Sequence, residues 1–195
     1  MDAASDTQMD KSPKNVNIWA DSTDFQIQGK RTFGKKSPEW SFKLNAPGRR
    51  YLFLRNGKGI IIKLFGGYSP KIRDYMWIEE RADWINDMLL GATTIGDNDW
   101  RVGMNSIDSK KVTIHAPHAE PKTKGENDEG LSKLTKAQQT YNRAVQRKRA
   151  RVENIFGILE KKFNIFQEAW AEEISQLDDL VWYATAIVNE MKILH

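Results

Sequence analysis

The sequence contains no cysteine, which excludes disulfide bridges, cysteine-based zinc sites and thiol chemistry. No apolar run approaches the roughly 20 residues that a membrane-spanning helix needs. The N-terminus, from Met1 to Gln8, is acidic and polar, unlike a secretory signal or a transit peptide. No glycine-rich phosphate loop opens a helix, and no Ser-His-Asp set is evident. These absences predict a soluble intracellular protein that does not use nucleotide-dependent chemistry.

The composition is that of one packed domain with a slight excess of positive charge. The chain has 195 residues, of which 39% are hydrophobic, including seven Trp, enough to bury a sizeable core. Thirty Lys and Arg face 26 Asp and Glu, so the net charge is +4. This balance favours polyanionic partners only weakly, since charge usually reflects a solvated surface. Residues 1–15 are expected to form a flexible leader, and residues 16–195 a single folded domain.

Three antiparallel strands in a meander are predicted to open the fold. The residues from Val16 to Ala20 alternate as a strand does and run directly into Asp21. The second strand is expected at residues 40–55, with a break near the Pro47-Gly48 pair, and the third at residues 59–65. The Asn56-Gly57 pair between them is a strong hairpin signal.

The rest of the chain predicts helices alternating with two short strands, hence an α/β protein with a mixed sheet and flanking helices. The Ser69-Pro70 pair has the pattern of a helix start, and Thr135 followed by Gln138 that of a capping box. In chain order we expect a helix at 70–91, strands at 92–96 and 111–116, a long helix to Phe163, and a last helix capped by Asp178 or Asp179.

Three acidic residues stand in positions from which their side chains can converge. Asp21 follows one predicted strand, and Asp97 follows another, with Gly96 permitting close backbone approach. If the two strands are neighbours, the two carboxylates share one rim of the sheet. Glu153 borders the buried stripe of the long helix, three residues before Phe156, and is expected to meet them.

Three convergent carboxylates suit a divalent metal site. Magnesium prefers hard oxygen ligands, and two such ions about 4 Å apart can activate a nucleophile and stabilise a leaving oxygen. Ordinary roles compete with this interpretation. A lone Asp after a strand is more often a turn or cap residue, and Arg149 and Glu153 have the common (i, i+4) spacing of a helix surface pair. Spacing alone suggests the site without securing it.

The residues around these acids resemble the catalytic domain of DDE-type transposases, and within it the Harbinger-like group, often described as DDE superfamily endonucleases. The resemblance covers roughly residues 15–166. It rests on the following stretches: Trp19-Ala20-Asp21-Ser22-Thr23, Lys43-Leu44 with Pro47-Gly48-Arg49-Arg50, Gly67-Tyr68-Ser69-Pro70 leading to Asp74, Gly96-Asp97, Tyr141-Asn142-Arg143, and Arg149-Ala150-Arg151-Val152-Glu153 with Phe156-Gly157.

The resemblance implies an RNase H-like fold and metal-dependent DNA cleavage and strand transfer, with two Mg²⁺ or Mn²⁺ ions. Asp21, Asp97 and Glu153 match the three catalytic and metal-binding acids of the family. Asp74 matches a further recurrent Asp, for which a role at the start of a helix is an equal alternative. DNA is the implied partner. A homo-oligomer or a separate DNA-binding subunit is compatible with it, and a eukaryotic protein of this kind would be nuclear.

Two departures from the family pattern favour an alternative function. Asp99-Trp100 stands where the family usually has Gly-Tyr. Trp100 can replace Tyr in packing, but Asp99 adds a charge beside Asp97 and is a candidate alternative ligand. Such transposases also carry an N-terminal helical DNA-binding region, and only a short leader precedes Asp21. The alternative is a truncated, decayed or domesticated copy that binds DNA or a protein partner without catalysis.

The long helix is strongly basic. Beside a phosphodiester site its cations would clamp the DNA backbone, which gives affinity without sequence recognition. The competing interpretation is a solvated helix face. The candidate DNA-binding residues are Arg143, Arg147, Lys148, Arg149 and Arg151, and Lys161 and Lys162 follow further along the helix.

Overall fold

The computed structural model describes residues 17–28, 34–119 and 134–193, without the side chains of residues 151–155, 165 and 193. The predicted leader, residues 1–15, lies outside the described residues. In the described ranges a mixed sheet is combined with five α-helices and two short 3-10 helices at Met104–Ser106 and Asn164–Phe166. The predicted α/β class with a mixed sheet is therefore confirmed.

The sheet has six strands, and its centre is strand β1 (Ile18–Gln26). β1 pairs antiparallel with β3 along its full length, and β3 pairs antiparallel with β4. On its other side β1 pairs in parallel with β5, and β5 in parallel with β6. The other strands are β2 (Trp40–Ser41), β3 (Ala46–Asn56), β4 (Ile61–Tyr68), β5 (Thr93–Ile95) and β6 (Thr113–His115).

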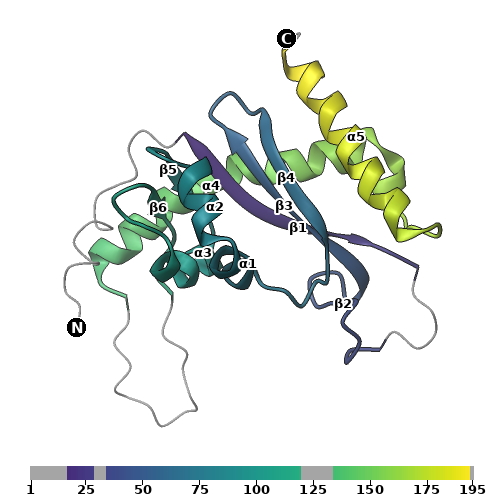
Figure 1. Cartoon of the computed structure of the whole chain (residues 1–195), viewed down its shortest axis with the longest axis horizontal. Coiled ribbons are helices and arrows are strands. Elements are labelled where there is room, and N and C mark those ends of the chain that lie inside the picture. The colour runs from purple at the N-terminus through teal and green to yellow at the C-terminus, as the bar shows by residue number, and fades with distance from the viewer. Residues whose placement is uncertain (1–16, 29–33, 120–133, 194–195) are drawn as a thin grey trace.

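Helices cover both faces of this sheet and give it two hydrophobic cores. Helices α1 (Asp74–Glu80), α2 (Ala82–Met88) and α3 (Asn98–Gly103) gather on one side of the strands (Figure 1). Helices α4 (Lys136–Lys162) and α5 (Ile174–Ile193) supply residues to the other core.

Alternating residues of β1 enter the two cores, because successive side chains of a strand point to opposite faces. Trp19 and Phe25 pack with the residues of α4 and α5. Ile18 and Ala20 pack with those of α1, α2 and α3. Asp21, two residues after Trp19, therefore faces α4.

The strand that carries Asp21 is longer than predicted. The sequence predicts its end at Ala20, but β1 continues to Gln26, so Asp21 lies inside the strand. The reason is the long antiparallel pairing with β3, which runs from Ile18 opposite Asn56 to Gln26 opposite Gly48. This pairing keeps the polar residues 21–24 in an extended conformation, although their sequence alone is typical of a turn.

The second predicted strand is also different. Only Trp40–Ser41 is extended, and a turn follows in which Asn45 has a φ of 51°. The chain then enters β3 and reaches the predicted Asn56-Gly57 turn. There the amide of Gly59 donates to the carbonyl of Asn56 at 2.9 Å, which confirms a tight connection at that point.

The predicted helix at 70–91 is two helices. The first begins at Asp74 rather than at Pro70. Arg81 separates it from the second, with φ −121° and ψ 24°, a non-helical conformation. Ile78 and Ala82 have the (i, i+4) spacing of one continuous stripe, so the sequence pattern does not reveal this break.

The two C-terminal helices were predicted with unequal success. The capping box of Thr135 and Gln138 is confirmed, with both reciprocal hydrogen bonds present. The last helix begins at Ile174, so the prediction that Asp178 or Asp179 caps it is wrong. Asp178 instead accepts a hydrogen bond from the Tyr51 hydroxyl of β3.

The segment between α4 and α5 returns to the far end of β1. Trp170 forms an isolated bridge with Ile27. Its amide donates to the Gln26 carbonyl at 3.0 Å, and its carbonyl accepts from the Gln28 amide at 2.6 Å. None of the helices in the described ranges is long and apolar enough to cross a lipid bilayer.

Candidate active site

The parallel pairing of β1 with β5 brings Asp21 and Asp97 to one place. Trp19 and Ile95 are opposite each other in this pair. Asp21 follows Trp19 by two residues, and Asp97 follows Ile95 by two residues. Because the strands are parallel, this register brings Asp21 and Asp97 close together. They line an open cleft of about 580 Å³, together with Ser22, Lys43, Arg50, Arg73, Asp74, Asp99, Arg149 and Phe156.

Asp21 is a buried carboxylate with one cation beside it. Its Oδ1 accepts a hydrogen bond from the Ser22 amide at 2.9 Å, and its Oδ2 lies 3.5 Å from Nη2 of Arg149. Burial raises the pKa of Asp21, Arg149 opposes this increase, and Asp97 adds to it. Repulsion between the two carboxylates fits their shared position.

Asp97 has a structural role as well as a place in the cleft. It caps α3, because its Oδ1 accepts from the amides of Asp99 at 2.9 Å and Trp100 at 3.4 Å. Burial, followed by the charge of Asp99, raises its pKa. A Cβ on Gly96 would lie 2.3 Å from Cγ of Trp100. Trp100 is fully buried, so its predicted packing role is confirmed.

Asp74 lines the same cleft as the two acids. It is the first residue of α1, as the helix-start alternative predicts, and it is 4% exposed. Burial raises its pKa to about 7, with further increases from Asp97 and Asp21. Its Oδ2 is buried and accepts no hydrogen bond from the described residues.

Asp99 is held by a cation of its own. Arg73, the residue before α1, donates from Nε and Nη2 to the two carboxylate oxygens of Asp99. Asp99 lines the cleft, but this fork-shaped ion pair occupies both of its oxygens.

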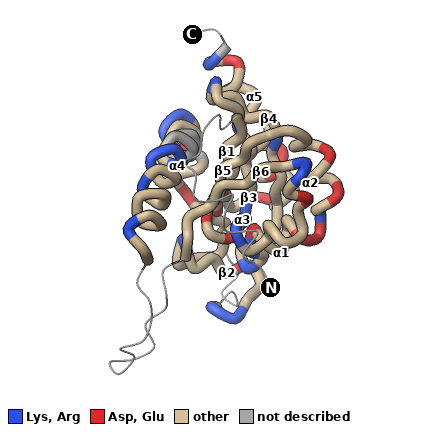
Figure 2. The backbone as a smooth tube through the Cα atoms, turned by 90° about the vertical axis from the view of Figure 1, so that its left-hand side faces the viewer, with Lys and Arg blue, Asp and Glu red and all other residues tan. Residues whose placement is uncertain are grey.

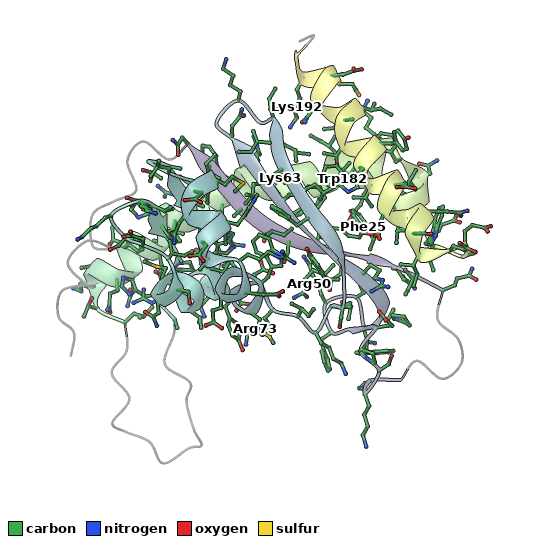
Figure 3. The ribbon with its side chains drawn as sticks, in the orientation of Figure 1. Phe25, Arg50, Lys63, Arg73, Trp182 and Lys192 are labelled. Carbon is green, nitrogen blue, oxygen red and sulfur yellow. The ribbon has the colours of Figure 1, made fainter. Side chains whose placement is uncertain are left out.

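The ion pair between Asp24, which is buried, and Arg50, which lines the cleft, was not predicted from the sequence. Asp24 accepts from Nε of Arg50 at 2.7 Å, from Nη2 at 3.1 Å, and from the Ser41 hydroxyl at 2.6 Å. Arg50 also donates from Nη1 to the Ile72 carbonyl at 3.1 Å, which fixes the segment leading to α1 (Figure 3). Asp24 and Arg50 face each other in the β1–β3 register, so a correct register prediction would have revealed them.

Glu153 lies on α4, but its side chain is outside the described residues. Positions three and four residues apart share a helix face, so position 153 lies on the face that carries Arg149 and Phe156. Both of these residues line the cleft. Among the side chains that the structure describes, no three His, Asp or Glu residues form a group that could hold a metal ion.

The predicted DNA-binding residues of α4 differ in where their side chains lie. Arg143 and Arg147 are exposed, one helical turn apart, and the cations of α4 are visible along its length in Figure 2. Arg149 instead points into the cleft toward Asp21. The carbonyl of Lys148 accepts from the Trp19 indole at 3.0 Å, and the side chain of Arg151 is not among those described.

The cleft offers oxygen donors of the kind that a hard cation binds, although the described side chains do not by themselves bring three of them around one point. The buried carboxyls of Asp21 and Asp74 and the half-buried one of Asp97 all have raised pKa values, because burial and repulsion from neighbouring carboxylates disfavour their charged forms. Asp74 also keeps a buried oxygen without a hydrogen bond among the described residues. A divalent ion would relieve both conditions, and oxygen ligands are those that Mg²⁺ and Mn²⁺ prefer.

Comparison with known proteins agrees with this chemistry. The family model described as DDE superfamily endonuclease matches residues 20–189. No curated protein and no solved structure shows significant similarity to the chain. The matched range contains Asp21, Asp74, Asp97 and Glu153 and covers most of the sequence, and on this basis the chain belongs to the DDE superfamily endonucleases.

Proposed function

We propose that this protein is a metal-dependent DNA endonuclease of transposase type, in which Asp21, Asp97 and Glu153 form the catalytic triad. The observation that carries the proposal is the shared register of Asp21 and Asp97, which brings two carboxylates into one open cleft. Family membership supports a nuclease or transposase in general. The mixed sheet, with three antiparallel strands and two parallel ones, supports an RNase H-like fold, and the resemblance of the sequence motifs supports the Harbinger-like group.

The acids would hold two divalent ions, Mg²⁺ or Mn²⁺. When bound, such ions activate an attacking water or DNA 3′-hydroxyl and stabilise the leaving oxygen. Asp21 and Asp97 supply carboxylate oxygens from the sheet, and position 153 lies on the facing side of α4. Asp74 is a further candidate because of its orphaned oxygen. Asp99 is a weaker one, since Arg73 holds it.

Cations around the cleft would bind the scissile phosphate. Lys43 donates to the Ser22 carbonyl at 3.2 Å at the cleft edge, and Arg149 lies within the cleft. Both can donate charge-assisted hydrogen bonds to phosphate oxygens. Arg143 and Arg147, exposed on α4, would hold the flanking DNA backbone without reading its sequence.

One observation favours a second candidate function, DNA or partner binding without catalysis. Arg149 lies beside Asp21, and Arg73 binds Asp99. Cations of the chain itself therefore neutralise part of the acidic charge, as expected for a domesticated or decayed copy that has no need of metal. A nuclear location, a homo-oligomer and a separate DNA-binding subunit are expectations under either function.

Plasmid nicking and metal binding separate the two functions. We expect wild-type protein to nick supercoiled plasmid with Mg²⁺ or Mn²⁺, and Asp21→Asn and Asp97→Asn to lose this activity while remaining folded. Asp83→Asn is the matched control, because Asp83 is exposed on α2. Nicking that survives both substitutions would refute the triad. Absence of metal binding to the wild type in calorimetry at millimolar metal would favour the non-catalytic function.

A further inference from the structure

A second hollow lies between the β3–β4 hairpin and the C-terminal parts of α4 and α5. We call it the hairpin groove, and its volume is about 410 Å³. Half of its lining residues are cations, and no Asp or Glu is among the described residues that line it. The lining consists of Arg55, Lys58, Gly59, Ile158, Lys162, Val188, Met191 and Lys192.

Two of these cations are held close together at the bend of the hairpin. Nζ of Lys192 donates to the Gly59 carbonyl at 2.7 Å. A Cβ on Gly59 would lie 3.0 Å from Nη2 of Arg55 and 3.2 Å from Nζ of Lys192, so both head groups converge on this glycine. Burial, then repulsion from Arg55, lowers the pKa of Lys192. Positive charges held this close together, as those of Arg55 and Lys192 are, attract an anion.

The floor of the groove is apolar, which restricts the kind of anion that it fits. Ile158 of α4 and Val188 and Met191 of α5 form this floor, and the cations stand around it. A sugar-phosphate backbone matches this arrangement, because its phosphates can pair with Lys and Arg while its sugars cover apolar surface.

Helix α4 connects the groove to the acidic cleft. Arg149 lines the cleft and Lys162 lines the groove. Thirteen residues separate these positions, which gives an axial distance of about 20 Å at 1.5 Å per residue and, at 3.6 residues per turn, places them on nearly opposite sides of the helix. In Figure 3, Lys192 lies well away from Arg50 and Arg73 of the cleft. A duplex held in the groove would therefore have to pass around α4 to enter the cleft.

We propose that the hairpin groove is a second DNA-backbone site, on the far side of α4 from the cleft. This inference rests on the proposed function, since it assumes that the same duplex enters the cleft. It adds cations from the hairpin and from α5 to those of the basic helix, and it involves no residue of the triad.

The test measures binding without cleavage. A fluorescein-labelled 20-base-pair duplex is titrated by anisotropy in EDTA at several salt concentrations. The double variant Lys58→Gln/Lys162→Gln changes two exposed side chains. If both contact phosphates, the slope of log K against log salt should fall by about 1.8, and binding at low salt should weaken by about tenfold or more.

Controls keep this result distinct from the proposed catalysis. Lys110→Gln/Lys111→Gln removes two exposed charges elsewhere and should leave the slope nearly unchanged. An unchanged slope in the groove variant would overturn the inference, and so would a poly-glutamate peptide of equal charge that competes as well as unlabelled duplex. Neither result bears on nicking, which depends on Asp21 and is measured separately with metal.

Discussion

Replacing Arg50 by methionine should reveal how strongly the floor of the cleft depends on one buried ion pair. The Asp24 side chain is 0% exposed and that of Arg50 is 19% exposed. The substitution removes both hydrogen bonds from the guanidinium to Asp24 and the bond to the Ile72 carbonyl. Among the described residues, the Ser41 hydroxyl would then be the side chain that still donates a hydrogen bond to Asp24.

The expected loss follows from leaving a buried charge without its partner. Removing one member of such a pair costs about 3–5 kcal/mol of unfolding free energy, whereas replacing both members by neutral groups costs much less. Arg50→Met should therefore be severely destabilising, and Asp24→Asn/Arg50→Met should recover part of that loss. We expect a coupling energy of about 1–3 kcal/mol between the two positions.

Urea denaturation of the wild type, the two single variants and the double variant measures this coupling. Arg81→Met is the control, because the Arg81 side chain is 42% exposed and lies 3.9 Å from an exposed Glu80. That change should stay within about 0.5 kcal/mol. A loss below about 1 kcal/mol for Arg50→Met, or strictly additive single losses, would refute the dependence on a buried pair.

Three further substitutions, one of them with a comparison variant, test the cleft and its support. Asp74→Asn should stabilise the metal-free protein near pH 8 but not near pH 4. The reason is that a carboxyl with its pKa raised to about 7 contributes stability that disappears as the pH rises through that value. Midpoints of urea denaturation in EDTA, compared between the variant and the wild type at both pH values, test this. Gly96→Ala should strongly destabilise the protein, because the added Cβ would contact Trp100. As the comparison, Gly157→Ala adds a Cβ that meets nothing within 4 Å and should raise the free energy of unfolding by about 0.5–1 kcal/mol. Thermal melts compare the two variants. Tyr51→Phe should cost about 1–3 kcal/mol in urea denaturation, because Asp178 loses a partly buried donor; equal stability would contradict this.

Local signals predicted those parts of the fold that depend on neighbouring residues. The capping box at Thr135 needs only its own first turn, and the turn at Asn56 only the residues around it. Asp21 and Asp97 could be selected because each is adjacent to a short apolar run. Their convergence needed a further assumption, that the two strands are neighbours, which the β1–β5 pairing satisfies.

Long-range pairing determined what the sequence could not show. The extension of β1 past Asp21 depends on β3, and the Asp24–Arg50 pair depends on the register of those two strands. Asp178 looked like a helix cap because Asp often is one, yet it bonds to Tyr51, 127 residues away in the sequence. Such partners leave no periodic pattern, so sequence spacing cannot find them.

The bridge at Trp170 bears on the tendency of this protein to self-associate. Strand β5 pairs with β1 only at Ile18 and Trp19, so the same edge of β1 beyond Trp19 has no strand partner among the described residues until Ile27 meets Trp170. Open strand edges recruit strands from other molecules and start aggregation. Because the segment after α4 closes the far end, the exposed edge is limited to the part of β1 that contains Asp21.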